Sequence, residues 1–107
     1  MRAAPILTLA LAAAPAPAQT QQPMLAGKAV FGEKCGMCHR ADGMGTGLLA
    51  RRVDPKVAEL EKRADLTTDY VRVAVRTGIG NMPWLSRGEV SDRQLDAIAS
   101  YLAKDGK

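Results

Sequence analysis

The chain has 107 residues, of which 47% are hydrophobic and 24% are charged, which suits a single small domain. Its formal net charge of +4 is too small to indicate a nucleic-acid-binding protein, whose charge is strongly basic. Only two cysteines and one histidine are present. A structural zinc site needs four ligands, so it would have to recruit carboxylates or a second chain.

The first eighteen residues have the pattern of a secretory signal peptide. Arg2 gives a positive start, a short apolar run follows over 6–14, and Ala16-Pro17-Ala18 supplies small residues before a cleavage site. We expect cleavage after Ala18, which lowers the net charge from +4 to +3 because only Arg2 is lost. An uncleaved anchor is the alternative, but a spanning helix needs roughly 20 apolar residues.

The mature chain is expected to begin with a flexible tail over 19–24, which is polar and ends in proline. One domain then covers 25–107. Its first element is a predicted helix over 25–35, because apolar residues up to Phe31 recur at near-helical spacing. Gly27 costs such a helix about 1 kcal/mol relative to alanine, so its presence indicates that another helix approaches closely.

The stretch Cys35-Gly36-Met37-Cys38-His39 is the most informative part of the chain. Two thiols three positions apart, followed directly by an imidazole, match the attachment site of a c-type haem. One helical turn places both thiols along one porphyrin edge, where each forms a thioether, and leaves His39 beneath the iron. A thioredoxin-like disulfide needs a βαβ setting, which is missing here. A structural disulfide or another metal site remains as an alternative, but the disulfide leaves His39 unexplained.

The middle of the chain is predicted to hold a loop and two helices. Three glycines make 40–47 a loop whose backbone can lie against the flat haem. Asp54 and Pro55 start a short helix that runs to about residue 62. Thr67 caps the next helix, which ends at Gly78 and buries an apolar stripe. β-branched residues in that stripe would also suit a strand, but the cap and stop signals favour a helix.

The last predicted helix runs from residue 92 to about 104. Ser91 and Gln94 form a capping box, and the apolar residues that follow recur with a period near 3.6. These residues are Leu95, Ile98, Ala99 and Leu102.

Over residues 24–104 the chain resembles the small class I cytochromes c of bacteria. The haem motif, the Met82-Pro83 pair and the capped last helix with Ile98 and Tyr101 carry the resemblance. It implies an all-α cytochrome c fold, in which three to five helices wrap around one covalently attached haem c and the N- and C-terminal helices pack together. The motif context is most similar to the cytochrome subunits of periplasmic dehydrogenases of the p-cresol methylhydroxylase type.

Met82 is the expected sixth ligand of the iron, with a core methionine as the alternative. A second histidine is excluded, because His39 is the only one. Three other methionines lie too near the tail or too close to the attachment motif, namely Met24, Met37 and Met44. His/Met ligation raises the reduction potential relative to bis-His ligation. An iron with both axial positions filled has no place for substrate, which favours electron transfer over catalysis.

Four further residues are candidates for the haem surroundings. The resemblance implies that Arg51 contacts a haem propionate, with a solvated surface charge as the alternative. Leu48 is expected to line the pocket, and Trp84 either shields the distal haem edge, contacts a partner or packs in the core. Thr46 stands where the family often has a proline, so its carbonyl is the expected acceptor for the proximal His39.

The predicted function is one-electron transfer in the periplasm by an exported protein that is soluble after signal cleavage and is not an enzyme. Its partners would be redox proteins, with a dehydrogenase or reductase as donor and an oxidase or another cytochrome as acceptor. Neither nucleic acid nor a membrane span in the mature chain is expected. A dedicated cytochrome subunit of a flavin- or quinone-dependent dehydrogenase is the alternative, and a haem enzyme with an open sixth site is the third hypothesis.

Overall fold

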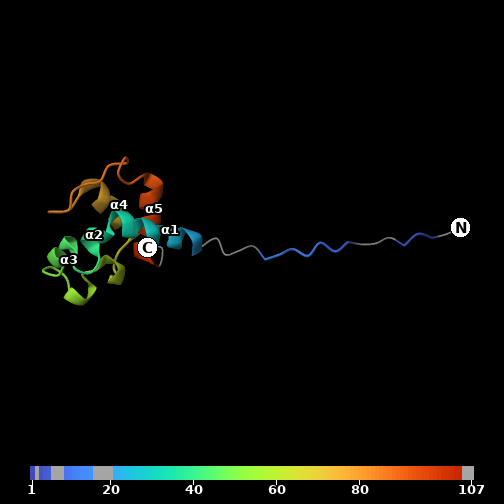
Figure 1. The fold of residues 1–107 in the computed structure, drawn as a ribbon, viewed down its shortest axis with the longest axis horizontal. Helices are drawn as coiled ribbons and strands as arrows, with labels where there is room; N and C mark the ends of the chain where they lie inside the picture. The colour runs from blue at the N-terminus through green and yellow to red at the C-terminus, as the bar shows by residue number, and fades with distance from the viewer. Residues whose placement is uncertain (2, 6–8, 16–20, 105–107) are drawn as a thin grey trace.

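The computed structural model describes residues 1, 3–5, 9–15 and 21–104. Its elements are α1 (Gln21–Lys34), α2 (Gly36–His39), α3 (Met44–Leu49), the 3-10 turns η1 (Pro55–Val57) and η2 (Leu60–Lys62), α4 (Thr68–Thr77) and α5 (Asp92–Ala103) (Figure 1). Within these described ranges there are helices and one isolated β-bridge, but no strand. The predicted all-α class is therefore confirmed.

The leader and the predicted tail are only partly described. The expected cleavage site after Ala18 and residues 19–20 lie outside the described residues. Residues 21–24, expected as a tail, are instead the first turn of α1. Pro23 is compatible with this start, because backbone N–H groups in the first turn of a helix have no intrahelical acceptor. No helix among the described residues has the length and apolar character required to cross a bilayer.

The first long helix packs against the last one, as the resemblance implied. Figure 1 shows α1 beside α5, and this pair makes the most extensive contact in the fold. A Cβ atom added at Gly27 would lie 2.7 Å from Tyr101 Cβ and would meet the carbonyl oxygen of Ala97. The aromatic rings of Phe31 and Tyr101 have centroids 6.0 Å apart. Gly27 is therefore explained by close helix packing, as predicted.

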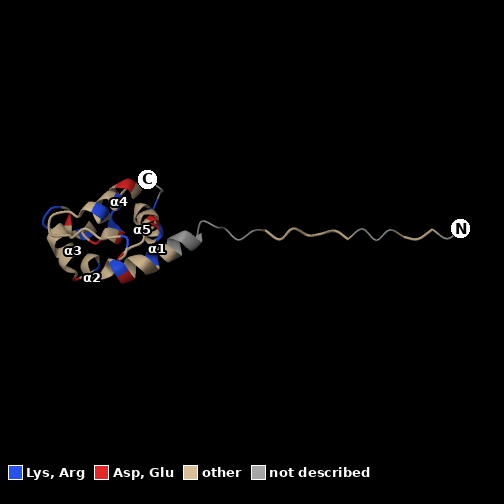
Figure 2. Cartoon of the chain, turned by 90° about the horizontal axis from the view of Figure 1, so that it is seen from above, with Lys and Arg blue, Asp and Glu red and all other residues tan. Residues whose placement is uncertain are grey.

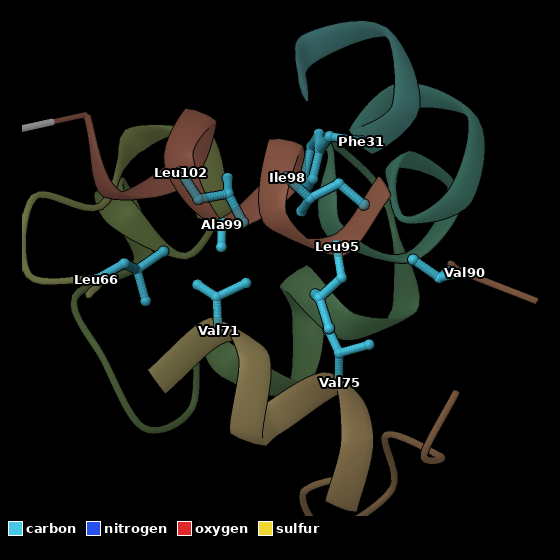
Figure 3. Packing of buried hydrophobic residues seen from close by; sticks show 9 residues of the cluster. All are labelled: Phe31, Leu66, Val71, Val75, Val90, Leu95, Ile98, Ala99 and Leu102. Atoms are coloured by element: carbon cyan, nitrogen blue, oxygen red, sulfur yellow. The ribbon is translucent and has the colours of Figure 1, made fainter. Parts of the chain in front are cut away.

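The core lies between α1, α4 and α5. Val71 and Val75 of α4 point toward the apolar face of α5, which supports the helical interpretation of that segment (Figure 3). The buried cluster consists of Phe31, Leu66, Val71, Val75, Val90, Leu95, Ile98, Ala99 and Leu102. Because α5 contributes to this cluster along its length, it is the element against which the other helices are positioned.

The caps predicted for the last two helices are both present. The Thr67 hydroxyl accepts from the backbone N–H of Tyr70 over 3.1 Å at the start of α4. At α5 the Ser91 hydroxyl accepts from Gln94 N over 3.1 Å, while the Gln94 side chain accepts from Ser91 N over 3.0 Å. Gly78 ends α4 with φ +75°, a conformation that favours glycine.

Two expectations about the middle of the chain are wrong. The helix predicted over 54–62 is two 3-10 turns, because Glu59 is extended (φ −67°, ψ 125°) and separates them, while Ala58 enters the core. Asp54 still caps the first turn by accepting from Lys56 N over 2.9 Å. The loop predicted over 40–47 is shorter, because the chain turns into α3 at Met44.

Candidate functional site

A cavity of about 420 Å³ opens into the helical body, and its wall is largely apolar. One part of the wall comes from the end of α1 with α2 and α3, another from α4 and the loop after it, and the back from α5. The lining includes Phe31, Cys35, Cys38, His39, Met44, Gly45, Leu48, Leu49, Arg51, Arg52, Leu60, Arg63, Leu66, Tyr70, Val71, Ala74, Val75, Ile79, Asn81, Met82, Pro83, Ile98 and Leu102.

The two thiols and the imidazole lie together on one helical turn, which gives them a common wall of the cavity. The backbone N–H groups of Cys38 and His39 both donate to the carbonyl of Cys35, over 3.2 and 3.0 Å. Neither cysteine is in a disulfide. Burial, with a smaller contribution from Cys38, raises the pKa of Cys35 to about 11, so this thiol is protonated near neutral pH.

His39 has the properties of a neutral metal ligand. Burial lowers the pKa of its imidazole below the ordinary value, and the neutral ring is the form that binds metals. Its Nδ1 atom is buried and has no hydrogen-bond partner among the described residues. A Cβ atom added at Gly45 would lie 3.0 Å from His39 Cε1. The glycine therefore serves close packing against the ring from within α3, although it was expected in a loop.

Thr46 does not occupy the position expected of it. Its carbonyl accepts from Ala50 N over 2.9 Å, because Thr46 lies within α3 and its carbonyl belongs to the helical hydrogen-bond pattern. The Thr46 hydroxyl instead donates to the Arg40 carbonyl over 2.8 Å. No described group accepts a hydrogen bond from His39 Nδ1, so the expected bond from the imidazole to the Thr46 carbonyl is not formed in this structure.

Met82 lies at the end of a tight turn and lines the same cavity as His39. Ile79 and Met82 exchange two backbone hydrogen bonds, of 3.1 and 2.9 Å, which close the turn. A Cβ atom added at Gly78 would lie 2.7 Å from the Met82 carbonyl oxygen and 2.9 Å from Trp84 N. Gly78 therefore allows the turn to fold back onto the end of α4 and so brings Met82 to the cavity.

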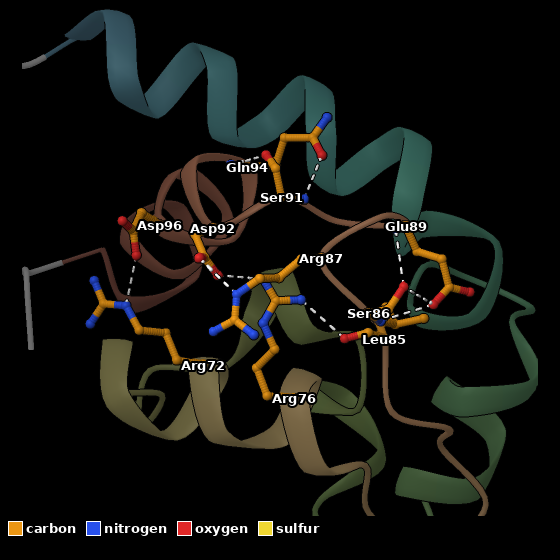
Figure 4. A network of polar contacts seen from close by, with 10 residues as sticks. All are labelled: Arg72, Arg76, Leu85, Ser86, Arg87, Glu89, Ser91, Asp92, Gln94 and Asp96. Carbon is orange, nitrogen blue, oxygen red and sulfur yellow. Dashed lines mark hydrogen bonds and ion pairs between the residues drawn. The ribbon is translucent and has the colours of Figure 1, made fainter.

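The segment after Met82 is tied to α4 and α5. Leu85 N donates to the Val75 carbonyl over 2.8 Å, and Arg76 donates to the Leu85 carbonyl over 3.0 Å. Arg76 also donates to Asp92 over 2.7 Å, and Arg87 donates to the same carboxylate over 2.9 Å (Figure 4). Because Gly78 N also donates to the Ala74 carbonyl over 2.8 Å, the methionine turn is held by hydrogen bonds on both sides.

Basic residues line the cavity, and Arg51 and Arg52 mark its mouth because they are also exposed to solvent. Arg51, Arg52 and Arg63 all contribute to the lining, and Arg63 is paired with Asp65 through two hydrogen bonds of 2.9 and 2.8 Å. Within the described part of the chain, Arg51 and Arg52 make no ion pair. Elsewhere basic and acidic residues are interspersed over the helical body (Figure 2). The mouth therefore offers unpaired positive charge to an anionic group.

The structure brings together most of the residues singled out from the sequence. Leu48 and Arg51 line the cavity with the haem motif and Met82. Trp84 does not, because this residue lies beyond the closed turn and is 63% exposed. Sequence reasoning missed Arg63 and Asn81, which also line the cavity. No local pattern marks either residue, since each reaches the wall only through the path of a loop.

The site fits a haem. It combines two free thiols on one turn, a half-buried imidazole whose Nδ1 has no hydrogen-bond partner among the described residues, the thioether of Met82 on another wall and a largely apolar interior. Fold and site together define a c-type cytochrome. A comparison with protein families matches residues 22–102 to "Cytochrome C oxidase, cbb3-type, subunit III", and the chain belongs to this family of cytochrome c domains.

The family assignment confirms the predicted cofactor, a covalently bound haem c with its iron. It also supports haem-based electron transfer, which requires redox partner proteins. The narrower resemblance to p-cresol methylhydroxylase subunits has no counterpart in this match. No curated protein and no solved structure matches the chain.

Proposed function

We propose that the chain is a periplasmic one-electron carrier in which Cys35 and Cys38 hold the haem and His39 and Met82 are the axial ligands. The observation that carries the proposal is the shared cavity, which brings the motif of α2 and the methionine turn to one space. When bound, the haem supplies a reversible one-electron couple. The chain's own residues hold the two ligands, exclude water with apolar side chains and keep the fold rigid around them.

Met44 is the rival of Met82, since it also lines the cavity. It begins α3 next to Gly45, which packs on the His39 ring, so it belongs to the same wall as that imidazole. Met44 is 74% exposed, whereas Met82 is half-buried against the core. These placements favour Met82 as the ligand from the other side.

Substitution of the two methionines tests the ligation directly. Met82→Ala should abolish the weak far-red absorption band of methionine-ligated ferric haem, and the reduced protein should then bind carbon monoxide. Loss of the thioether, which favours Fe(II), should also lower the reduction potential. Met44→Ala is the matched control and should keep the band. A wild-type protein that binds carbon monoxide when reduced would instead favour the haem enzyme with an open sixth site.

Arg51 is proposed to contact a haem propionate at the cavity mouth, with Arg52 beside it. A positive charge near the haem favours the reduced state, which carries one positive charge less. Arg51→Gln should therefore lower the reduction potential, by an amount on the order of tens of millivolts for a solvent-screened charge.

Export to the periplasm is proposed from the leader sequence, and c-type haem is attached outside the cytoplasm in bacteria. The test is N-terminal sequencing of the holoprotein from a periplasmic fraction. A mature chain that begins at Gln19 would support the proposal, and a haem protein that retains Met1 in the cytoplasm would overturn it.

A dedicated dehydrogenase subunit is the second candidate. The exposure of Trp84 next to the methionine turn favours a protein contact near the site, because tryptophan is enriched at protein interfaces. Size-exclusion chromatography of native extract separates the two functions. A haem signal confined to the monomer size supports the free carrier, and co-elution with a flavoprotein or quinoprotein supports the subunit.

A further inference from the structure

The backbone of Arg40, the residue after His39, is fixed on two sides. Its N–H donates to the Gly36 carbonyl over 3.0 Å and closes the single turn of α2. Its own carbonyl accepts from Gly43 N over 3.0 Å and from the Thr46 hydroxyl over 2.8 Å. The chain therefore leaves the haem motif through a residue that is held between α2 and α3.

The side chain of Arg40 lies across α1 in a space left by two glycines. Its Cζ atom is 5.6 Å from the ring centroid of Phe31, within the range of a cation–π contact. A Cβ atom added at Gly32 would lie 2.9 Å from Arg40 Nη1, and one added at Gly36 would lie 3.3 Å from Cδ. The two glycines thus allow the guanidinium to pack directly on the helix.

The guanidinium of Arg40 also binds a carboxylate whose backbone is anchored. Its Nε donates to Glu61 Oε1 over 2.8 Å. The Glu61 backbone is held in turn, because its carbonyl accepts from Lys104 Nζ over 2.6 Å. The hydrogen bond from Arg40 lowers the pKa of Glu61, and the Tyr101 hydroxyl and the charge of Lys28 act in the same direction. Glu61 is therefore an ionised acceptor at neutral pH.

We propose that Arg40 is a positioning residue, which fixes the direction in which the His39 imidazole enters the cavity by clamping the end of α2 to α1 and to Glu61. The inference rests on the proposed ligand role of His39. No described residue accepts a hydrogen bond from His39 Nδ1, so the ring is oriented by its backbone and by packing against Gly45. Orientation of a ligand by its surroundings tunes the metal it binds.

The test compares ferric holoproteins carrying Arg40→Gln, Arg40→Lys or Glu61→Gln. Arg72→Gln is the matched control, because Arg72 is about as exposed as Arg40 (40% against 44%) and pairs with Asp69 and Asp96 at α4 and α5, away from α2. Haem methyl shifts in the proton NMR spectrum report the orientation of the axial ligands. The reduction potential and the thermal midpoint are measured on the same samples.

The three variants at Arg40 and Glu61 should change the haem methyl shifts and the reduction potential more than Arg72→Gln does. Their thermal midpoints should change by about as much as that of Arg72→Gln. Arg40→Lys keeps the positive charge, so a shift in this variant assigns the effect to geometry. If Arg40→Gln does not accumulate as holoprotein, Arg40→Lys and Glu61→Gln decide the question.

If the haem methyl shifts and the reduction potentials of Arg40→Lys and Glu61→Gln match those of the wild type, Arg40 does not position His39. This result would leave the proposed function unaffected. Absence of His39 ligation in the wild-type spectrum would overturn the proposed function as well, so the two failures are distinguishable.

Discussion

Gly27 and Gly47 are both helical glycines, but only one of them is required by its surroundings. Gly27 in α1 has the Ala97 carbonyl and Tyr101 Cβ in the space of a Cβ atom, whereas Gly47 in α3 has no heavy atom within 4 Å of that position. The first glycine is required by packing between α1 and α5. The second is a helical residue on an exposed surface, where alanine is the better helix former.

Opposite effects on stability are therefore expected for Gly27→Ala and Gly47→Ala. Gly27→Ala should lower the free energy of unfolding by about 1–3 kcal/mol, because the added methyl group overpacks a helix interface. Gly47→Ala should raise it by up to about 1 kcal/mol through helix propensity. Chemical denaturation of the two holoproteins measures both changes. Equal effects of the two substitutions would contradict the difference in packing.

The turn that carries Met82 has a defined conformation, because Gly78 starts it and backbone hydrogen bonds between Ile79 and Met82 close it. Gly78 has φ +75° and leaves less than 3 Å between an added Cβ atom and both the Met82 carbonyl and Trp84 N. A side chain there has to displace the turn from α4. Since Met82 is at its end, displacement of the turn moves the proposed ligand away from the cavity.

Gly78→Ala is expected to weaken the methionine ligation without removing the methionine. The far-red absorption band should decrease or shift, and reduced protein should bind carbon monoxide in part. Gly88→Ala is the control, because a Cβ atom there has its nearest neighbour, Ser86 Oγ, at an ordinary 3.6 Å. An unchanged band in Gly78→Ala would mean that the turn does not position Met82.

The sequence predicted correctly those helix ends that are determined by residues a few positions apart. The caps at Thr67 and Ser91, and the stop at Gly78, involve partners within a few positions. The 54–62 segment failed because burial of Ala58 and the extended Glu59 replaced a continuous helix, and this depends on the rest of the fold.

The candidate site likewise contains a part that local sequence predicts and a part that depends on long-range contacts. The spacing of Cys35, Cys38 and His39 is local and was predicted, whereas the pairing of Arg40 with Glu61 joins residues 21 positions apart and was not. The cavity role of Arg63 likewise depends on the course of a loop. A single sequence contains no signal for such contacts, because many charged residues offer equivalent partners until the fold is known.

At the scale of the whole molecule, ion pairs between arginines and carboxylates connect separate helices and loops. Arg40 and Glu61 join the end of α2 to the segment before α4. At Asp92, the first residue of α5, Arg76 attaches α4 and Arg87 attaches the segment that follows Met82. The pKa of Glu61 lies below its ordinary value mainly because of the hydrogen bond from Arg40. The pKa of Asp92 is lowered mainly by Arg87 and then by Arg76.

These shifts fix the sign of the pH dependence of stability. A carboxyl whose pKa is lower in the folded state stabilises the fold above its unfolded pKa, because the unfolded chain binds more protons as the pH falls. For Glu61 the ordinary value is 4.5, so its contribution is complete at pH 7 and is lost as the pH falls below about 4.5 through the folded pKa. Solvent screening keeps this contribution below about 1 kcal/mol.

Comparison of wild type with Glu61→Gln isolates this contribution from every other titrating group, including the haem propionates. The difference in free energy of unfolding should be largest at pH 6–7 and should shrink as the pH falls from about 4.5 to 3, because wild-type Glu61 then becomes neutral like the glutamine. Denaturant titrations across this range measure it. A difference that stays constant down to pH 3 would show that the carboxylate charge of Glu61 does not stabilise the fold, and that its partner Arg40 is held by packing on α1 alone.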